Sequence, residues 1–267
     1  MHLSEPAPAK LNLALHVRGK LPDGRHRLET VFAFCLDGDR LEAEEADGFS
    51  LAVKGPFAGD LGDGDDNLVL NAARRLAEEA DVSAGAEMVL TKNLPVASGV
   101  GGGSADAAAA LRLLTRLWNV DPAIAASIAP ELGSDVPACL LSMAARGDGA
   151  GDMLRLIDSG VSGAATLLVN PLVPLSTAEV FAAWDGRDQG PLDEWRDGRN
   201  DLEAPARSLV PEIGDVLEWL QSREGVAFVR MSGSGATCFG LFDSEMARDA
   251  AAQQCPSNLW HLATVLR

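Results

Sequence analysis

The sequence contains no tyrosine and only four lysines among its 267 residues, against 39 aspartates and glutamates. Lysines and arginines together number 22, so the formal charge is 22 − 39 = −17 at pH 7. Nucleic-acid backbones are bound by clustered lysines and arginines, and this composition therefore argues against a nucleic-acid partner. An anionic ligand must be met locally, by backbone amides or by a few well-placed cations. The excess of acidic residues is explained mainly by solubility, because a large net charge keeps a protein soluble.

The sequence also lacks the patterns that are typical of a metal-binding site or of a transmembrane segment. The four cysteines are widely spaced, without a C-x-x-C pair, and the four histidines form no ligand cluster. A metal site built from nitrogen and sulfur ligands is therefore not expected. No apolar run approaches the roughly 18 residues of a membrane span, and no secretory signal is evident at the N-terminus. We expect a cytoplasmic protein without a membrane partner; no feature of the sequence specifies an oligomeric state.

Hydrophobic periodicity predicts a mixed α and β chain, long enough for two medium domains. We expect helices at residues 67–80, 105–118, 122–128, 211–223 and 245–254, and strands at 10–17, 30–36, 40–46, 49–53, 87–91, 154–157, 165–169, 226–231 and 236–242. Loops are expected at 59–66 and 185–199, and a helix cap at Asn200-Asp201. Residues 147–152 are expected to form a turn between domains, with a place in the lining of the nucleotide site as the alternative. The order of elements changes near residues 150–160, which predicts domains at 1–155 and 156–267.

A glycine-rich segment joins the predicted strand at 87–91 to the predicted helix at 105–118. Its residues are Pro95, Val96, Ala97, Ser98, Gly99, Val100, Gly101, Gly102, Gly103, Ser104 and Ala105. Glycines let the backbone approach a ligand and adopt positive φ, successive N–H groups point at an anion, and the helix adds its positive dipole end. Ser104 is the expected N-cap, and its hydroxyl is placed to reach a phosphate or its Mg²⁺. The segment predicts a binding site for the triphosphate of ATP.

Other loops of similar composition do not fit these residues. A Walker A loop needs a lysine after its last glycine, and none stands here. The dinucleotide pattern G-x-G-x-x-G fails because Ser104 takes the sixth position, and the hydrolase pattern G-x-S-x-G fails because Asp106 stands where the second glycine belongs. The remaining alternative is a turn that only joins two elements. It is disfavoured because four glycines within five residues cost conformational entropy.

The pattern P-x-x-x-G-V-G-G-G-S-A-D-A at residues 95–107 resembles the phosphate-binding motif of the GHMP kinase superfamily. Two more segments resemble motifs of this superfamily in the same order, A-P-A-K-L-N-L at 7–13 and S-G-S-G-A-T at 232–237. The resemblance spans nearly the whole chain. It implies an α+β fold, with a ribosomal S5 domain 2-like N-terminal domain and a ferredoxin-like C-terminal domain, and an ATP-dependent kinase that uses Mg²⁺.

Further segments resemble the members of this superfamily that phosphorylate the tertiary 2-hydroxyl of a CDP-linked methylerythritol in non-mevalonate isoprenoid synthesis. They are P-D-G-x-H-x-L-x-T at 22–30, D-N-L-V at 66–69, G-S-D-V-P at 133–137, S-T-A-E-V-F at 176–181 and R-N-D-L-E at 199–203. Two alternatives stay open. One is another GHMP kinase, with a mevalonate- or homoserine-type substrate, and the other is a nucleotide-binding protein that has lost the chemistry.

The resemblance assigns the chemistry to Asp135 and Lys10. The catalytic aspartate of the family falls on Asp135, which would accept the proton of the attacking hydroxyl. From the residues alone, a helix cap is the favoured interpretation of Asp135. Lys10, on a strand face with Asn12, would pair with Asp135, orient it and offset charge on the substrate oxygen. Asn12 itself is expected to contact the substrate. The alternative for Lys10 is an exposed lysine of an edge strand.

The resemblance also implies a site for the cytosine, which the family holds between two aromatic rings beside a histidine. His26 matches the histidine and Phe181 matches one ring, whereas Arg25 stands where the family usually has tyrosine. A guanidinium plane can also stack on a base, so we expect Arg25 to take part in binding. An ordinary core aromatic is the alternative for Phe181. Gly233 and Ser234 are expected beside the substrate phosphates.

Overall fold

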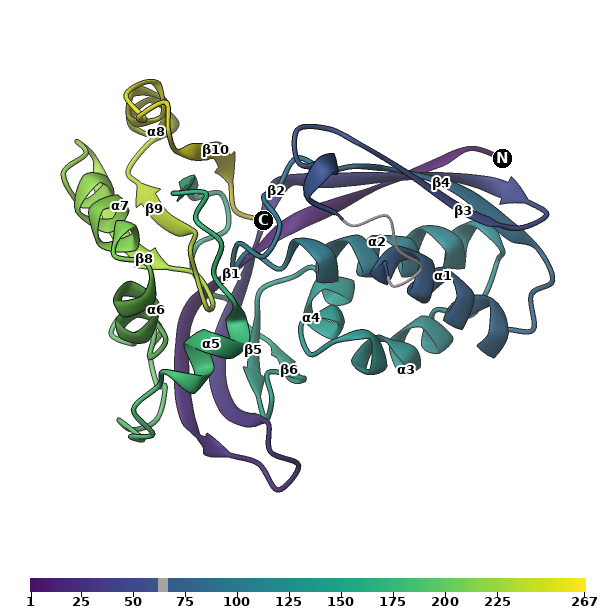
Figure 1. The fold of residues 1–267 in the computed structure, drawn as a ribbon, viewed down its shortest axis with the longest axis horizontal. Helices are drawn as coiled ribbons and strands as arrows, with labels where there is room; N and C mark the ends of the chain where they lie inside the picture. The colour runs from purple at the N-terminus through teal and green to yellow at the C-terminus, as the bar shows by residue number, and fades with distance from the viewer. Residues whose placement is uncertain (62–66) are drawn as a thin grey trace. The chain divides into compact units, whose positions relative to one another are not determined.

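The computed structural model describes residues 1–61 and 67–267, so most of the predicted loop at 59–66 lies outside the described residues (Figure 1). Contacts divide the chain into two compact units. Unit 1 consists of Met1–Ala9, Asp37–Val96 and Gly101–Ser142, and unit 2 of Lys10–Leu36, Ala97–Val100 and Met143–Arg267. Two long strands, β1 (Leu3–Lys20) and β2 (His26–Ala46), contribute to both units. The domain boundary between residues 155 and 156 stays a prediction.

Unit 1 contains a small sheet and a group of helices. Strand β4 (Gly85–Thr91) pairs in parallel with β3 (Phe49–Lys54) and antiparallel with residues 40–46 of β2. A short 3-10 helix, η1 (Ala58–Asp60), follows β3. Because parallel neighbours need a crossover connection, the chain forms the helix α1 (Leu68–Glu79) between β3 and β4. Asn67 caps α1, its side chain accepting from the Val69 amide at 2.9 Å, as the sequence predicts for a helix that opens at Asn67.

The helices of unit 1 pack around α2 (Gly102–Leu117), which contacts α1, α3 (Pro122–Leu132) and α4 (Val136–Leu141). In Figure 1 these four helices lie together. The run Ala105 to Leu111 of α2 is buried on nearly every side, because alanine is small enough to let neighbouring helices approach. Asp121 caps α3 ahead of Pro122, which suits the first helical position.

Unit 2 begins with the remaining parts of β1 and β2, which pair with each other. Residues 30–32 of β2 also pair with β5 (Ala145–Asp148), which continues into β6 (Met153–Leu156) through a tight turn. Residues 147–152 therefore form the end of a hairpin, which confirms the predicted turn. The loop predicted at 185–199 contains no helix and no regular strand.

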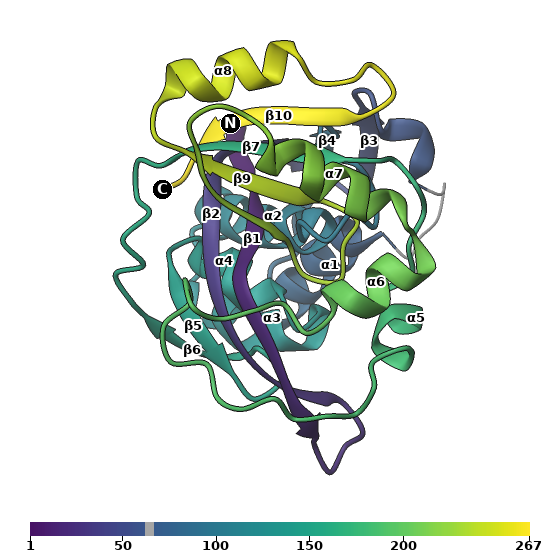
Figure 2. The same cartoon turned by 90° about the vertical axis from the view of Figure 1, so that its left-hand side faces the viewer.

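The rest of unit 2 is a four-stranded antiparallel sheet with the order β10-β7-β9-β8, formed by β7 (Ala165–Asn170), β8 (Val226–Met231), β9 (Cys238–Phe242) and β10 (Trp260–Val265). Helices α5 (Thr177–Ala182), α6 (Glu203–Leu209) and α7 (Glu212–Gln221) connect β7 to β8, and α8 (Glu245–Gln253) connects β9 to β10. Helix α7 packs on β8 and β9, and α8 on β7 and β10 (Figure 2). A β-α-β-β-α-β unit with strand order 4-1-3-2 is ferredoxin-like, which confirms the expectation.

Candidate active site

The polar face of β1 is buried in unit 2. Lys10 is 3% exposed, which contradicts the alternative of an exposed edge-strand lysine. Its ammonium donates to Oδ1 of Asn12 at 2.9 Å and lies 5.5 Å from the centre of the Phe32 ring. The side-chain amide of Asn12 in turn donates to the Thr30 hydroxyl at 2.8 Å. Lys10 and Asn12 are therefore a preorganised pair, held by a neighbouring strand.

The middle of the glycine segment, Ala97–Val100, belongs to unit 2 and lies against β1 and the C-terminal glycine turn. The Lys10 amide donates to the Val100 carbonyl at 2.9 Å, and the Thr237 amide donates to the Ser98 carbonyl at 3.1 Å. The Ser232 hydroxyl donates to the Gly99 carbonyl at 3.0 Å. Unit 2 thus brings together segments of all three motifs that the sequence singled out.

Two glycines in this region have no room for a side chain. Gly99 has φ +77°, and a Cβ there would lie 2.6 Å from the carbonyl oxygens of Ser232 and Gly235. Gly233 has φ +57°, and its Cβ would lie 3.0 Å from the Gly99 carbonyl oxygen and 3.1 Å from Oδ1 of Asn12. Because each glycine faces the other segment, these contacts explain why both segments are rich in glycine.

Asn200 supports the same turn and also the start of α6. The N-cap of α6 is Leu202, and Oδ1 of Asn200 accepts from the Leu202 amide at 3.0 Å, so Asn200 supports the start of the helix without standing at its N-cap. Its side-chain amide also donates to the carbonyls of Met231 and Gly233, at 2.9 and 2.8 Å. Asp201 accepts from the Val17 amide at 2.7 Å and so binds β1. Both side chains act on backbone that is far away in sequence.

The end of the glycine segment opens α2 in unit 1. Gly101 adopts the left-handed conformation with φ +65° and stands at the N-cap of α2, which begins at Gly102. The prediction that Ser104 is the N-cap is therefore wrong: Ser104 is the third residue of the helix. The first amides of an α-helix have no partner within the helix, and they combine with its dipole to favour an anion. These are the amides of Gly102, Gly103 and Ser104.

Asp135 precedes α4 in unit 1 and is half-buried. It stands at the N-cap position of α4, but its side chain makes no capping hydrogen bond, so capping does not account for this carboxylate. Lys10 belongs to unit 2 and Asp135 to unit 1, and the pairing between them stays a prediction.

A buried ion cluster beside the glycine segment was not anticipated from the sequence. The Lys92 ammonium is 1% exposed and donates to Asp39 and, at 2.8 Å, to Asp106. Burial lowers the pKa of Lys92, but the carboxylates of Asp106 and Asp39 outweigh it and raise the pKa overall. Burial raises the pKa of Asp106 to about 7, against the lowering effect of Lys92.

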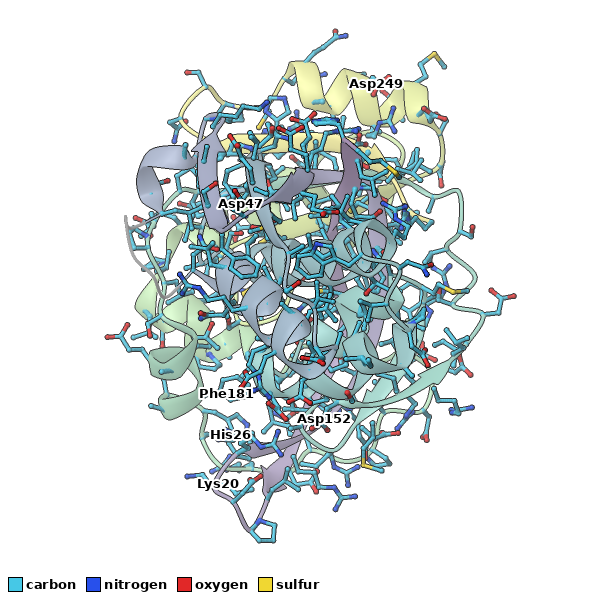
Figure 3. The ribbon with its side chains drawn as sticks, turned by 90° about the vertical axis from the view of Figure 1, so that its right-hand side faces the viewer. Lys20, His26, Asp47, Asp152, Phe181 and Asp249 are labelled. Carbon is cyan, nitrogen blue, oxygen red and sulfur yellow. The ribbon has the colours of Figure 1, made fainter. Side chains whose placement is uncertain are left out.

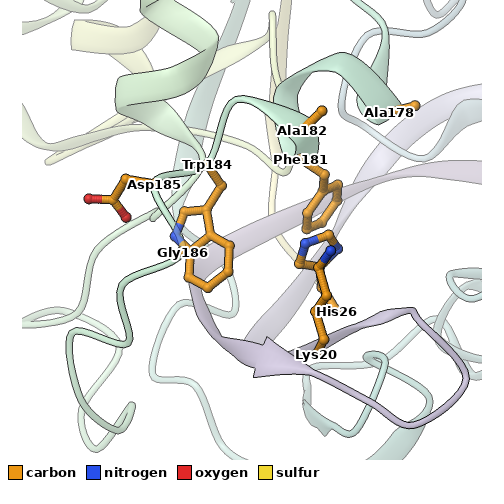
Figure 4. Close-up of a pocket in the computed structure, with 8 residues that line it drawn as sticks. All are labelled: Lys20, His26, Ala178, Phe181, Ala182, Trp184, Asp185 and Gly186. Atoms are coloured by element: carbon orange, nitrogen blue, oxygen red, sulfur yellow. The ribbon is translucent and has the colours of Figure 1, made fainter.

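A second site of unit 2 is a cavity of about 600 Å³ lined by Lys20, His26, Ala178, Phe181, Ala182, Trp184, Asp185 and Gly186 (Figure 4). The His26 and Phe181 rings stack with centres 4.6 Å apart, and the Trp184 indole stands edge-on to His26 at 5.7 Å. His26, Phe181 and Lys20 lie close together in Figure 3. Burial and then the charge of Lys20 lower the pKa of His26, so its imidazole is neutral at pH 7.

Trp184 was missed because no motif contains it, although it lies three residues after Phe181. Arg25 was expected beside the base but is exposed, and it is not one of the residues that line the cavity. Its guanidinium donates to Asp23 at 2.8 Å and to Asp152 at 3.2 Å. A stacking role for Arg25 stays a prediction.

Comparison with known proteins agrees with this arrangement. The model of the GHMP kinases N terminal domain matches residues 67–143, and the model of the GHMP kinases C terminal domain matches residues 186–261. No helix in the described part of the chain is long and apolar enough to cross a membrane.

Relatives match over the full length of the chain. Proteins named 4-diphosphocytidyl-2-C-methyl-D-erythritol kinase from Rhizorhabdus wittichii and Novosphingobium aromaticivorans are each 49% identical, with 100% of this chain and 96% and 94% of the relatives covered. A crystal structure of 4-(cytidine 5'-diphospho)-2C-methyl-D-erythritol kinase is 33% identical, with a TM-score of 0.82 over 100% of this chain and 99% of the other. A homoserine kinase from Cytophaga hutchinsonii, 18% identical with a TM-score of 0.75 over 99% of this chain and 95% of the other, shares the fold.

The two matched domains, together with the fold, define an enzyme of the GHMP class that transfers phosphate to an alcohol. The chain belongs to the GHMP kinase family and, within it, groups with these 4-diphosphocytidyl-2-C-methyl-D-erythritol kinases.

Proposed function

We propose that this chain transfers the γ-phosphate of ATP to the 2-hydroxyl of 4-diphosphocytidyl-2-C-methyl-D-erythritol, in the cytoplasm, as a step of non-mevalonate isoprenoid precursor synthesis. The observation that carries the choice of substrate is the cavity of His26, Phe181 and Trp184 in a chain that matches its relatives from end to end. A nucleobase needs a flat apolar surface beside a polar edge, and these three rings offer both. Mevalonate and homoserine contain no base that would use such a cavity.

The triphosphate of ATP binds along residues 95–105. Its charge is met by backbone amides and by the N-terminus of α2, since no Walker lysine is present. This mode of binding suits a chain with a net charge of −17, because it needs no cluster of cations. Gly233 and Ser234, in the turn packed on Gly99, would lie beside the phosphates of the CDP-linked substrate; the Ser234 hydroxyl lies 2.9 Å from that of Thr177.

The reaction itself is an in-line displacement at the γ-phosphorus. The substrate oxygen forms the new P–O bond, the bond from the γ-phosphorus to the β-bridging oxygen breaks, and ADP leaves. The hydroxyl proton passes to the Asp135 carboxylate. Lys10, fixed by Asn12, orients that carboxylate and offsets charge on the attacking oxygen.

Mg²⁺ accompanies the nucleotide in this proposal. Within residues 1–61 and 67–267, no group of three or more His, Cys, Asp or Glu side chains is arranged to hold a metal ion. The Ser104 hydroxyl, in the first turn of α2, would be a protein ligand of a cation held mainly by the phosphate oxygens. Such a cation would neutralise charge on the phosphates.

A coupled assay of ADP release tests the proposal directly. ATP and the CDP-linked methylerythritol should give turnover, whereas mevalonate and homoserine at equal concentration should give less than about 1% of that rate, because a lost binding site for the base costs several kcal/mol. Equal rates with mevalonate or homoserine would reject this substrate. ADP release without phosphate on any acceptor would reject the kinase activity.

A further inference from the structure

The ion cluster of Lys92, Asp39 and Asp106 lies entirely in unit 1 and is nearly inaccessible to water. The side chains of Lys92, Asp39 and Asp106 are 1%, 0% and 4% exposed. Burying three ionisable groups is costly unless each is paired, and one lysine here serves two carboxylates. In the described part of the chain, Oδ1 of Asp106 has no hydrogen-bond partner, so Asp106 is held through Oδ2 by Lys92. Because burying these charges costs free energy, we expect the cluster to have a function.

The cluster contacts the glycine segment where the chain enters it. Oδ1 of Asp39 accepts from the backbone amides of Asn93 at 2.5 Å and Leu94 at 2.9 Å. The Asn93 side chain donates to the Gly38 carbonyl at 3.0 Å, which strengthens the same connection. The residues that lead from β4 into the segment are thus bound to β2.

The cluster also contacts the chain where it leaves the segment. A Cβ at Gly102, the first residue of α2, would lie 3.0 Å from the Lys92 ammonium, so this backbone rests on the lysine itself. Asp106, in the second turn of α2, accepts from the same ammonium at 2.8 Å. One ammonium group therefore connects the entry and the exit of a segment whose geometry sets the direction of its amides.

Lys92 does not contact a phosphate directly in this arrangement. Its ammonium is buried and occupied by two carboxylates, so it offers no free positive charge to an anion. We propose that Lys92, Asp39 and Asp106 are positioning residues for ATP: they fix the two ends of the glycine segment so that its amides converge on the triphosphate. This inference rests on the proposed ATP site at residues 95–105, and it adds residues outside that segment.

The test uses Asp106 variants of the full chain, because Lys92→Ala would leave two buried carboxylates unpaired and risks unfolding. Asp106→Ala leaves Lys92 and Asp39 as a matched pair and releases the start of α2. The dissociation constant of Mg-ATP, measured by isothermal titration calorimetry without an acceptor, should rise about tenfold, because misplaced ligands lose affinity and rate together. In steady state, KM for ATP should rise while KM for the acceptor stays unchanged.

Two further variants separate positioning from general loosening. Asp106→Asn keeps an oxygen that accepts from Lys92 and should restore ATP affinity to within about twofold of wild type. Glu5→Ala removes a comparable partly buried ion pair from the same helix, since Glu5 binds Arg112 at 2.6 Å and Arg116 at 2.7 Å. It should lower the melting temperature and leave the ATP dissociation constant unchanged.

The outcomes are distinct. Asp106→Ala with wild-type ATP affinity overturns the inference, as does an equal loss of affinity in Asp106→Ala and Glu5→Ala, or an Asp106→Asn variant as weak as Asp106→Ala. Calorimetry needs no acceptor, so a wrong acceptor substrate leaves this result intact. A wild-type chain that does not bind ATP overturns the proposed function and this inference together.

Discussion

The Ser232 hydroxyl donates to the carbonyl oxygen of Gly99 at 3.0 Å and accepts from the backbone amide of Asn12 at 3.1 Å. One small side chain therefore connects the C-terminal glycine turn to the glycine segment and to β1, across 133 and 220 positions of sequence. At these distances the two glycine segments pack closely together, and a side chain added between them should disturb both.

Gly99→Ala should destabilise the chain and weaken ATP binding. The new Cβ meets two carbonyl oxygens at 2.6 Å, and φ +77° adds backbone strain, for a total of about 1–3 kcal/mol or more. Urea unfolding and ATP calorimetry measure both effects. Gly24→Ala is the matched control, because Gly24 has φ +87° but no atom within 4 Å of its Cβ position. If both variants lose the same stability and neither loses ATP affinity, close packing at Gly99 is not what holds the segment.

Asp135→Asn and Lys10→Ala should each lose turnover while the fold and ATP binding persist. A residue that handles the proton of the nucleophile contributes about 10²- to 10⁴-fold to the rate, so kcat should fall by that range. Circular dichroism and ATP calorimetry verify that the variants are folded and bind nucleotide.

Controls for these two variants are available in the same chain. Asp121→Asn replaces an aspartate that caps α3, a position where asparagine serves as well, and Lys54→Ala removes an exposed lysine paired with Glu42. Both should retain kcat. Near-wild-type kcat in either Asp135→Asn or Lys10→Ala would remove that residue from the mechanism.

Phe181→Ala and Trp184→Ala should weaken binding of the CDP-linked substrate and leave ATP binding unchanged. Base–aromatic contacts contribute about 1–3 kcal/mol each, so KM for the acceptor should rise about 5- to 150-fold. Arg25→Ala should have a smaller effect, since Arg25 pairs with Asp23 and Asp152 and does not line the cavity.

Substrates with a different base test whether the cavity recognises the hydrogen-bonding edge of the nucleobase. A UDP-linked analogue should bind more weakly than the CDP-linked substrate, because its base presents a different set of donors and acceptors to His26. Equal affinity for the two would show that the cavity holds a base without reading it.

The contribution of His16 to the stability of the chain should fall as pH decreases from 6.5 to 5.5. His16 is 2% exposed; its Nδ1 donates to the Gly190 carbonyl at 3.1 Å, and its Nε2 accepts from the Arg199 amide at 3.1 Å. Burial lowers the pKa of His16 below its ordinary value of 6.5. Below pH 6.5, His16 is therefore protonated more readily in the unfolded chain than in the folded chain. Its contribution to the free energy of unfolding decreases by up to about 1.4 kcal/mol per pH unit.

His16→Gln keeps an acceptor for Arg199 and removes the titration, so the slope of unfolding free energy against pH should decrease. His26→Gln provides the comparison, because His26 also has a lowered pKa but lies in the cavity. An unchanged slope in His16→Gln would show that other groups govern the acid sensitivity.

The local sequence pattern predicted much of the secondary structure of this chain. The strand–glycine–helix order at 85–117 and the cap at Asn67 follow from periodicity and glycine content. The ferredoxin-like C-terminal domain follows only from the resemblance that spans three motifs. Local pattern also misplaced the start of α2. Ser104 is the better capping residue by composition, but Gly101 adopts the left-handed conformation and α2 begins directly after it.

The sequence by itself predicted a phosphate site on backbone amides without a Walker lysine, because glycines and a following helix are adjacent in the chain. Only the tertiary structure decided what holds those amides in place. Asp39, Lys92 and Asp106 come from β2, the end of β4 and α2, and Ser232 reaches Gly99 across 133 residues. Burial makes these polar contacts selective, since a charge without its partner is costly there, and burial is a property of the folded chain.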